Sequence, residues 1–260
     1  MIKRSSIHIL LLTLTSLFGF RVNAQFGFER LLDVPVTESS SLQTMPWAGG
    51  MDYCQFSNID LDFDGDLDLF VFDRTCDKVL TFIQNGSAGT MDWEYDPSYE
   101  SVFPEDLHDW ALLVDYNCDG LPDIYTYATG GVRVYRNTGD SGSGHSYVLE
   151  NPFLFTVFWS PPATPMYFNS VDIPAFVDVD NDGDIDCLQF GSAAVAVEYN
   201  KNLSMETYGV CDSLIYETKN ECWGGFKEDG SSSAIELYAT SYPCNGTLPG
   251  EESWKPEDRG

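Results

Sequence analysis

The stretch Asp178-Val-Asp-Asn-Asp-Gly-Asp-Ile-Asp186 is one of three related stretches in this chain. The other two are Asp60-Leu-Asp-Phe-Asp-Gly-Asp-Leu-Asp68 and Asp115-Tyr-Asn-Cys-Asp-Gly-Leu-Pro-Asp123. Each has a carboxylate or amide side chain at positions one, three, five and nine, and a glycine at position six. Three versions of one pattern predict three copies of one structural unit.

The side chains of each stretch suit a hard divalent cation. Ca²⁺ takes about six to eight oxygen ligands at about 2.3–2.6 Å, and a short loop surrounds it only by turning sharply. Glycine permits that turn because it adopts positive φ at little cost. Position seven is expected to contribute its backbone carbonyl, so leucine is acceptable there. We therefore predict three Ca²⁺ sites, formed by Asp60, Asp62, Asp64, Asp66 and Asp68, by Asp115, Asn117, Asp119, Leu121 and Asp123, and by Asp178, Asp180, Asp182, Asp184 and Asp186.

An EF-hand is the obvious alternative for such loops, and the sequence disfavours it. An EF-hand loop needs a bidentate Glu at position twelve, where this chain has Val71, Thr126 and Gln189. The residues after each loop, at 69–72, 124–127 and 187–190, are mostly apolar and rich in β-branched and aromatic side chains, which favour strands over an exiting helix. We expect each loop to connect two β-strands.

The pattern D-x-[DN]-x-D-G-x-x-D between strands resembles the FG-GAP/VCBS repeat, the calcium-bearing blade of integrin-type β-propellers and of many secreted bacterial proteins. The resemblance covers about residues 53–205. It extends to a following strand that ends in an Asn turn, at Asn85, Asn137 and Asn200. No Phe-Gly…Gly-Ala-Pro flank precedes the loops, so the bacterial VCBS-like variant is the better match. The resemblance implies an all-β fold, a β-propeller or partial propeller of four-stranded antiparallel blades with Ca²⁺ loops between strands.

The chain divides into segments around these loops. Residues 1–24 are typical of a secretory signal peptide, with a basic start, an apolar stretch and a small residue at the cleavage point. Residues 25–52 are expected to hold an N-terminal strand, Phe26–Leu32, and a Ser/Thr-rich linker, Thr37–Thr44. Three blades are expected at about 53–97, 108–158 and 171–218. Residues 219–260 form either a degenerate blade, with a strand near 234–238, or the start of a continuing region.

The loop starts are 55 residues apart (115 − 60) and then 63 apart (178 − 115), a spacing expected for four-stranded blades. Three blades do not close a ring, since propellers have about four to eight. The length after the signal peptide, 260 − 24 = 236 residues, divided by the mean spacing of 59 gives four. A four-bladed ring with one degenerate blade is arithmetically possible, but the N-terminal part of a longer propeller protein is favoured.

Charge and cysteine content restrict the function classes. The formal charge is −28, and it becomes −31 once the three basic residues of the signal peptide are removed. Such a chain repels nucleic acid and anionic lipid, because phosphate binding needs clustered Lys and Arg. The seven cysteines of an exported chain are free to form disulfides. Proximity in sequence favours Cys54–Cys76 and Cys211–Cys222, and an odd count leaves at least one thiol outside intrachain pairs.

No convincing catalytic constellation is present. The Gly139–Gly144 segment contains a Gly-Asp-Ser-Gly sequence that is explained by a hairpin turn, and His108 and His145 are the only histidines after the signal peptide. We expect a secreted, calcium-binding adhesion scaffold for an extracellular protein or polysaccharide, without a transmembrane span after signal cleavage. The alternative is the propeller portion of an extracellular carbohydrate-active lyase or hydrolase. The loop at 115–123 is expected to bind Ca²⁺ most weakly, because Asn117 and Leu121 replace two carboxylates.

Overall fold

The computed structural model describes residues 31, 34–86, 90, 92–191, 195–232, 234–237 and 243–244. The expected signal peptide lies outside these residues, as does most of the expected strand at 26–32. The chain forms two compact units, residues 1–47 and 48–260. No helix in the described part of the chain combines the length and apolar character needed to cross a membrane.

The structure is built mainly from short strands. They are β1 (Thr37–Glu38), β2 (Ser41–Leu42), β3 (Cys54–Ile59), β4 (Asp68–Asp73), β5 (Lys78–Gln84), β6 (Trp93–Tyr95), β7 (Ala111–Val114), β8 (Asp123–Ala128), β9 (Gly131–Asn137), β10 (Tyr147–Asn151), β11 (Phe155–Val157), β12 (Thr164–Pro165), β13 (Ala175–Val177), β14 (Asp186–Phe190), β15 (Val197–Asn202), β16 (Tyr216–Asn220), β17 (Phe226–Glu228) and β18 (Ile235–Leu237). The helical elements are η1 (Pro97–Val102), α2 (Ser204–Tyr208) and η2 (Trp223–Gly225).

The described part of the first unit is a small hairpin. Strands β1 and β2 pair antiparallel around Ser39 and Ser40, which both have positive φ. Two positive-φ residues suit a two-residue hairpin turn, because that turn matches the twist of the strands. The indole Nε1 of Trp47 donates to the carbonyl of Val34 over 2.9 Å. The range 37–44, expected to be a linker, therefore contains a hairpin.

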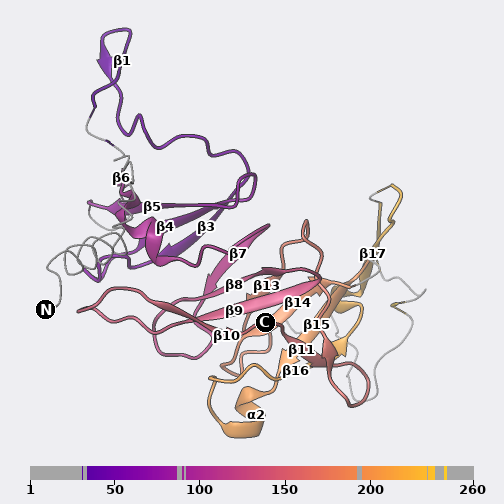
Figure 1. Ribbon diagram of the computed structural model, residues 1–260. Coiled ribbons are helices and arrows are strands. Elements are labelled where there is room, and N and C mark those ends of the chain that lie inside the picture. The colour runs from indigo at the N-terminus through magenta and orange to yellow at the C-terminus, as the bar shows by residue number, and fades with distance from the viewer. Residues whose placement is uncertain are drawn as a thin grey trace, which may run out of the picture. The chain divides into compact units, whose positions relative to one another are not determined.

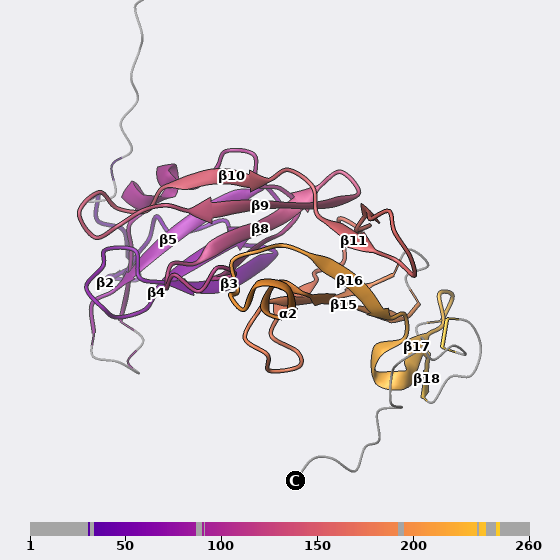
Figure 2. The same ribbon diagram turned by 90° about the horizontal axis from the view of Figure 1, so that it is seen from below.

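The second unit contains three consecutive four-stranded meanders, which we call repeat sheets one, two and three (Figures 1 and 2). They comprise β3–β6, β7–β10 and β13–β16, and all neighbouring strands within them are antiparallel. The strands expected after each loop are β4, β8 and β14. The all-β prediction is thus confirmed. The described residues form these sheets without closing them into a ring.

The boundary between repeat sheets two and three differs from the expected one. Residues 108–158 were expected to form one unit, yet β11 pairs in parallel with β16, so that Thr156 lies opposite Tyr216. Strand β12 adds to β11, and the third sheet therefore has six strands. The hairpin β11–β12 is an insertion between the second and third repeats, attached to the outer strand of the third.

The repeat sheets pack face to face through apolar side chains. Sheets one and two share a core that includes Phe70, Phe72 and Ile124. Sheets two and three share a second core, in which the rings of Tyr125 and Phe176 stack with centroids 4.0 Å apart. Fully burying one such side chain contributes about 1.5–3 kcal/mol, so these two cores are the main apolar contribution to the unit.

Arg74 also joins all three repeats. Its guanidinium donates to the backbone carbonyl of Asp109 in the second repeat and, over 2.9 Å, to that of Ser170 before the third. The same group lies 4.6 Å from the centre of the Tyr53 ring. Hydrogen bonds from a charged donor are stronger than neutral ones, so Arg74 links the turn after β4 to the segments that precede β7 and β13.

The disulfides differ from the expected pairs. They join Cys118 to Cys211 and Cys222 to Cys244, and Cys54, Cys76 and Cys187 are free thiols. Cys211 and Cys222 cannot pair with each other because the five residues of β16 separate them. A strand rises about 3.3 Å per residue, whereas a disulfide needs Cα atoms about 4.4–6.8 Å apart.

The third repeat sheet exposes the face that the first two bury. Val177, directly before the third loop, is 47% exposed, whereas Ile59, its equivalent in the first repeat, is 1% exposed. Val114, the equivalent in the second repeat, packs against the core shared with sheet three. Ile173, four residues before Val177, is 46% exposed. We call this surface the open face of sheet three.

The open face predicts self-association of the purified chain. Val177→Lys should lower the apparent molar mass measured by light scattering at micromolar concentration, because a charge on this face opposes apolar contact. Val148→Lys is the matched control, since Val148 is 46% exposed but lies on β10, outside the open face. Equal masses for both variants and the unmodified chain would show that the open face does not drive association.

Candidate metal centre

Each loop turns through two residues of positive φ. Glycine at position six has φ of 97° in Gly65, 88° in Gly120 and 102° in Gly183. Position four also has positive φ, with 61° in Phe63, 60° in Cys118 and 62° in Asn181. The glycine is required because such φ values favour a residue without a Cβ atom, while position four adopts the left-handed conformation at a cost of about 1–2 kcal/mol.

The carboxylate at position one organises the turn. In the first loop, the two oxygens of Asp60 accept from the backbone N–H groups of Asp64 and Gly65, both over 3.1 Å. Asp115 and Asp178 make the same pair of hydrogen bonds in the other loops. Position five accepts from the N–H of position seven in all three copies, over 2.9–3.1 Å. The loop carboxylates thus hold the backbone before any cation is considered.

The aspartate at position nine closes each loop from inside the sheet. Asp68, Asp123 and Asp186 are 0% exposed. One oxygen of each accepts from the N–H of position two, over 2.7, 3.2 and 3.0 Å. The other accepts from a backbone N–H at the end of the following strand, over 2.8, 2.7 and 2.8 Å. We call the three donors of that second bond the bridging residues; they are Gln84, Asn137 and Asn202.

The bridging residues correct the expected Asn turn. Asn137 is as expected, but the equivalent residues are Gln84 rather than Asn85 and Asn202 rather than Asn200. The turn between the second and third strands has two residues in the second repeat, 129–130, and is longer in the first and third repeats. A longer turn places a later residue of the third strand beside the closing aspartate. The side-chain oxygen of each bridging residue accepts from the N–H two residues later, at Gly86, Gly139 and Ser204. A glutamine therefore takes the same role as the two asparagines.

Burial makes the closing aspartates costly to ionise. Desolvation raises the pKa of Asp123 to about 7 and that of Asp186 to about 6, despite the hydrogen bonds that oppose the shift. Desolvation also raises the pKa of Asp68. Neighbouring loop carboxylates add to each shift by repulsion. A cation beside these groups would offset both effects, because an opposite charge favours the ionised carboxylate.

These pKa shifts predict opposite pH dependences without and with calcium. An unfolded aspartate has a pKa of about 3.9, so the folded state binds protons more tightly. In EDTA the free energy of unfolding should therefore fall as pH rises from about 4 through about 7. Calcium requires the ionised form, so the rise in melting temperature on adding calcium should be larger at pH 8 than at pH 5. A calcium-induced rise that is the same at both pH values would contradict this.

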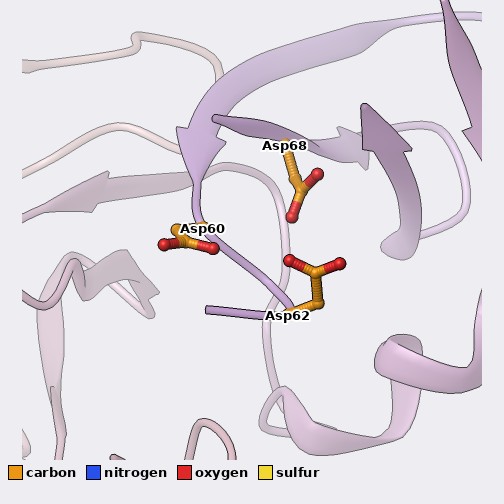
Figure 3. A group of neighbouring side chains, drawn as sticks. All are labelled: Asp60, Asp62 and Asp68. Carbon is orange, nitrogen blue, oxygen red and sulfur yellow. The ribbon is translucent and has the colours of Figure 1, made fainter. Parts of the chain in front are cut away.

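Three carboxylates of the first loop converge on one point. Ligand oxygens of Asp60, Asp62 and Asp68 lie within 4.8 Å of one another. Figure 3 shows the carboxylates of Asp62 and Asp68 facing each other, with Asp60 beside them. Among the described residues, no Lys or Arg lies within ion-pair distance of these three groups. This all-oxygen set with uncompensated charge fits Ca²⁺.

The three loops are not identical in the carboxylates they gather. Asp178, Asp180 and Asp186 repeat the arrangement of the first loop. In the second loop, position three is Asn117, whose amide Nδ2 donates to Asp119 over 2.9 Å. Position five lies apart from this cluster in the first loop, where Asp64 accepts from the Asp66 N–H. In the first and third loops, the fold therefore brings together positions one, three and nine.

The third loop also contains groups that the loop pattern alone does not predict. Lys201 forms ion pairs with Asp180, with Asp182 over 3.0 Å, and with Glu206 of α2. The hydroxyl of Tyr199 lies 3.3 Å from Asp180 Oδ2. A second group of carboxylates within 4.8 Å is formed by Asp180, Asp182 and Glu206. The loop pattern could not show these residues because they come from β15 and from the segment after it.

Position four joins the first and second loops to the next repeat. In the first loop, the ring of Phe63 stacks on His145 of the second repeat with centroids 4.5 Å apart, and His145 Nε2 lies 2.8 Å from the Asp60 carbonyl. In the second loop, Cys118 is bonded to Cys211 of the third repeat. In these two loops, the side chain of the left-handed residue therefore contacts a connecting segment of the next repeat.

Part of the chain that contains these loops matches a known repeat family. Residues 115–188 match the model of the FG-GAP-like repeat. This segment is an FG-GAP-like repeat. The match begins at the second loop and ends just after the third, so an FG-GAP-like repeat here includes β8–β13 and two of the three acidic loops. The resemblance inferred from the loop pattern is confirmed for this segment. The searches of curated proteins and of solved structures returned no match.

Proposed function

We propose that this FG-GAP-like repeat protein is a calcium-stabilised β-propeller segment that acts as an extracellular binding or adhesion scaffold. The observation that carries the proposal is the convergence of Asp60, Asp62 and Asp68 in a loop whose backbone pattern recurs twice. The two disulfides are consistent with an oxidising, extracellular location. Asp60, Asp62 and Asp68 would hold Ca²⁺, which would supply the charge that these carboxylates lack.

The size of the calcium effect follows from mass action. A cation that binds only the folded state stabilises it by RT ln(1 + [Ca]/Kd). For an extracellular site with a Kd of about 10⁻⁴ M, millimolar calcium contributes about 1.4 kcal/mol. Three such sites would contribute about 4 kcal/mol, a large share of a typical stability of about 5–15 kcal/mol.

Chelation should therefore lower the melting temperature by several degrees, and added calcium should restore it. Magnesium should restore less, because it demands a tight octahedron and gives up water reluctantly. Asp62→Asn should weaken calcium binding measured by calorimetry, since it removes one of the three converging charges. Asp172→Asn is the control, because it removes a carboxylate that lies outside the three loops. An unchanged melting curve in EDTA, with no calcium heat, would refute structural calcium sites.

We also propose that the chain binds rather than catalyses. The two basic residues nearest one another in the sequence of the repeats are Arg133 and Arg136, and Arg133 is ion-paired with Asp106. His145 is buried between Asn137 and the first loop, where its ring nitrogens are hydrogen-bonded. His108 is paired with the neighbouring Asp109 over 2.7 Å. Arg133, His145 and His108 are thus all engaged in local structure.

The inserted hairpin β11–β12 and the residues around it carry exposed aromatic side chains. Phe155 is 47% exposed, Trp159 is 67% exposed, and Tyr167 just beyond the hairpin is 50% exposed. Trp159 has φ of 63°, and a bulky residue in this region marks strain that often accompanies a binding role. Exposed aromatic rings of this kind suit stacking on a sugar ring or packing on a protein.

Binding through this hairpin predicts loss of a ligand signal on Trp159→Ala. The test applies the labelled chain to arrays of polysaccharides and extracellular proteins. Trp159→Ala should lose most of the signal at any ligand that the unmodified chain retains, without a change in melting temperature. Trp223→Ala is the matched control, because Trp223 is also partly exposed but lies in η2. Equal retention by Trp159→Ala and the unmodified chain would exclude the hairpin as the binding surface.

A further inference from the structure

The third loop differs from the first because a cation of the protein itself lies among its carboxylates. The Lys201 ammonium pairs with Asp180, Asp182 and Glu206, and its side chain is only 16% exposed. Asp180 belongs to two groups at once, because it also converges with Asp178 and Asp186. Any metal ion at the third loop must therefore compete with Lys201 for Asp180.

A fourth carboxylate, that of Asp184, adds negative charge near Lys201. Asp184 is 0% exposed and accepts from the Met205 N–H over 2.8 Å through Oδ2. Its other oxygen has no hydrogen-bond partner among the described residues. Asp184 interacts electrostatically with Asp182, Glu206 and Lys201. Buried carboxylates are costly without a compensating charge, and Lys201 is the positive group that interacts with all of them.

The three repeats differ at the position that supplies this cation. The residue before the bridging residue is Ile83 in the first repeat, Arg136 in the second and Lys201 in the third. Ile83 carries no charge, so the equivalent strand position leaves the first loop uncompensated. Glu206 comes from α2, which lies between β15 and β16. Compared with the first repeat, the third repeat thus has both a cation and an extra acid beside its loop.

We propose, on the basis of the calcium binding proposed above, that Lys201 is a built-in counter-cation of the third loop. It occupies the position between Asp180, Asp182 and Glu206, near the buried Asp184. The third loop therefore folds without calcium and binds calcium more weakly than the first loop. From the sequence, only the second loop was expected to bind calcium weakly. With Lys201 in place, the third loop is also a weak calcium site, and the first loop depends most on calcium.

The test replaces the ammonium and keeps its apolar stem. Lys201→Met should increase calcium affinity at one site on the order of tenfold, equivalent to about 1.4 kcal/mol, as measured by calorimetry. Adding Asp180→Asn to Lys201→Met should abolish the gain, which assigns it to the third loop. Lys219→Met is the matched control, because Lys219 lies on the neighbouring strand β16 and pairs with Glu217 over 2.8 Å; it should leave calcium affinity unchanged.

Melting in EDTA separates this role from calcium binding as such. Lys201→Met should melt several degrees below the unmodified chain and Lys219→Met in EDTA, and Lys201→Arg should keep the original value because it retains the charge. If no variant binds calcium but Lys201→Met still melts early in EDTA, the calcium proposal fails and the counter-cation role stands. If Lys201→Met matches the unmodified chain in both EDTA melting and calcium affinity, the counter-cation role is overturned.

Discussion

The structure of each repeat depends on one fully buried aspartate that accepts two backbone hydrogen bonds. In each repeat this aspartate links the second residue of the acidic loop to the last residue of the third strand of the sheet. The aspartates are Asp68, Asp123 and Asp186, and the third strands are β5, β9 and β15. The loop, the first hairpin and the second hairpin of each sheet therefore meet at one carboxylate. Because this group is desolvated, its negative charge must be compensated by the hydrogen bonds and by a nearby cation.

This constraint explains why the loops are acidic and why they differ from one another. The first loop gathers three carboxylates with no basic partner in the described part of the chain, so it depends most on an external cation. The second replaces a carboxylate by Asn117, whose amide donates within the loop. The third carries Lys201. One backbone geometry is thus maintained with three different balances of charge, and the repeats need not respond alike to calcium removal.

Local patterns predicted the loops and the strands around them, because glycine at position six and apolar residues after position nine act over a few residues. The turn at 139–144 and the strand near 234–238 were also predicted from short local sequences and are present. Contacts between repeats were not predictable in this way. The Cys118–Cys211 bond spans 93 residues, and it forms because the packing of sheet two on sheet three brings two loops together.

The bridging residues illustrate a second limit of sequence spacing. The expected Asn turn after the third loop was placed at Asn200, but the register of the hairpin places Asn202 beside Asp186. Register depends on turn length and bulges, such as the irregularity between Tyr199 and Asn200, which a repeat pattern does not reveal. Lys201 and Glu206 were missed for a related reason, since they approach the third loop from another strand and from α2.

Hydrogen exchange of the amides bonded to the closing aspartates tests the account most directly. The Leu61 and Gln84 amides report on Asp68, and the Val179 and Asn202 amides report on Asp186. EDTA should strongly reduce protection at Leu61 and Gln84 and have a much smaller effect at Val179 and Asn202, because Lys201 pairs with Asp180 and Asp182 of the third loop. Protection at Leu61 and Gln84 that is the same in calcium and in EDTA would contradict it.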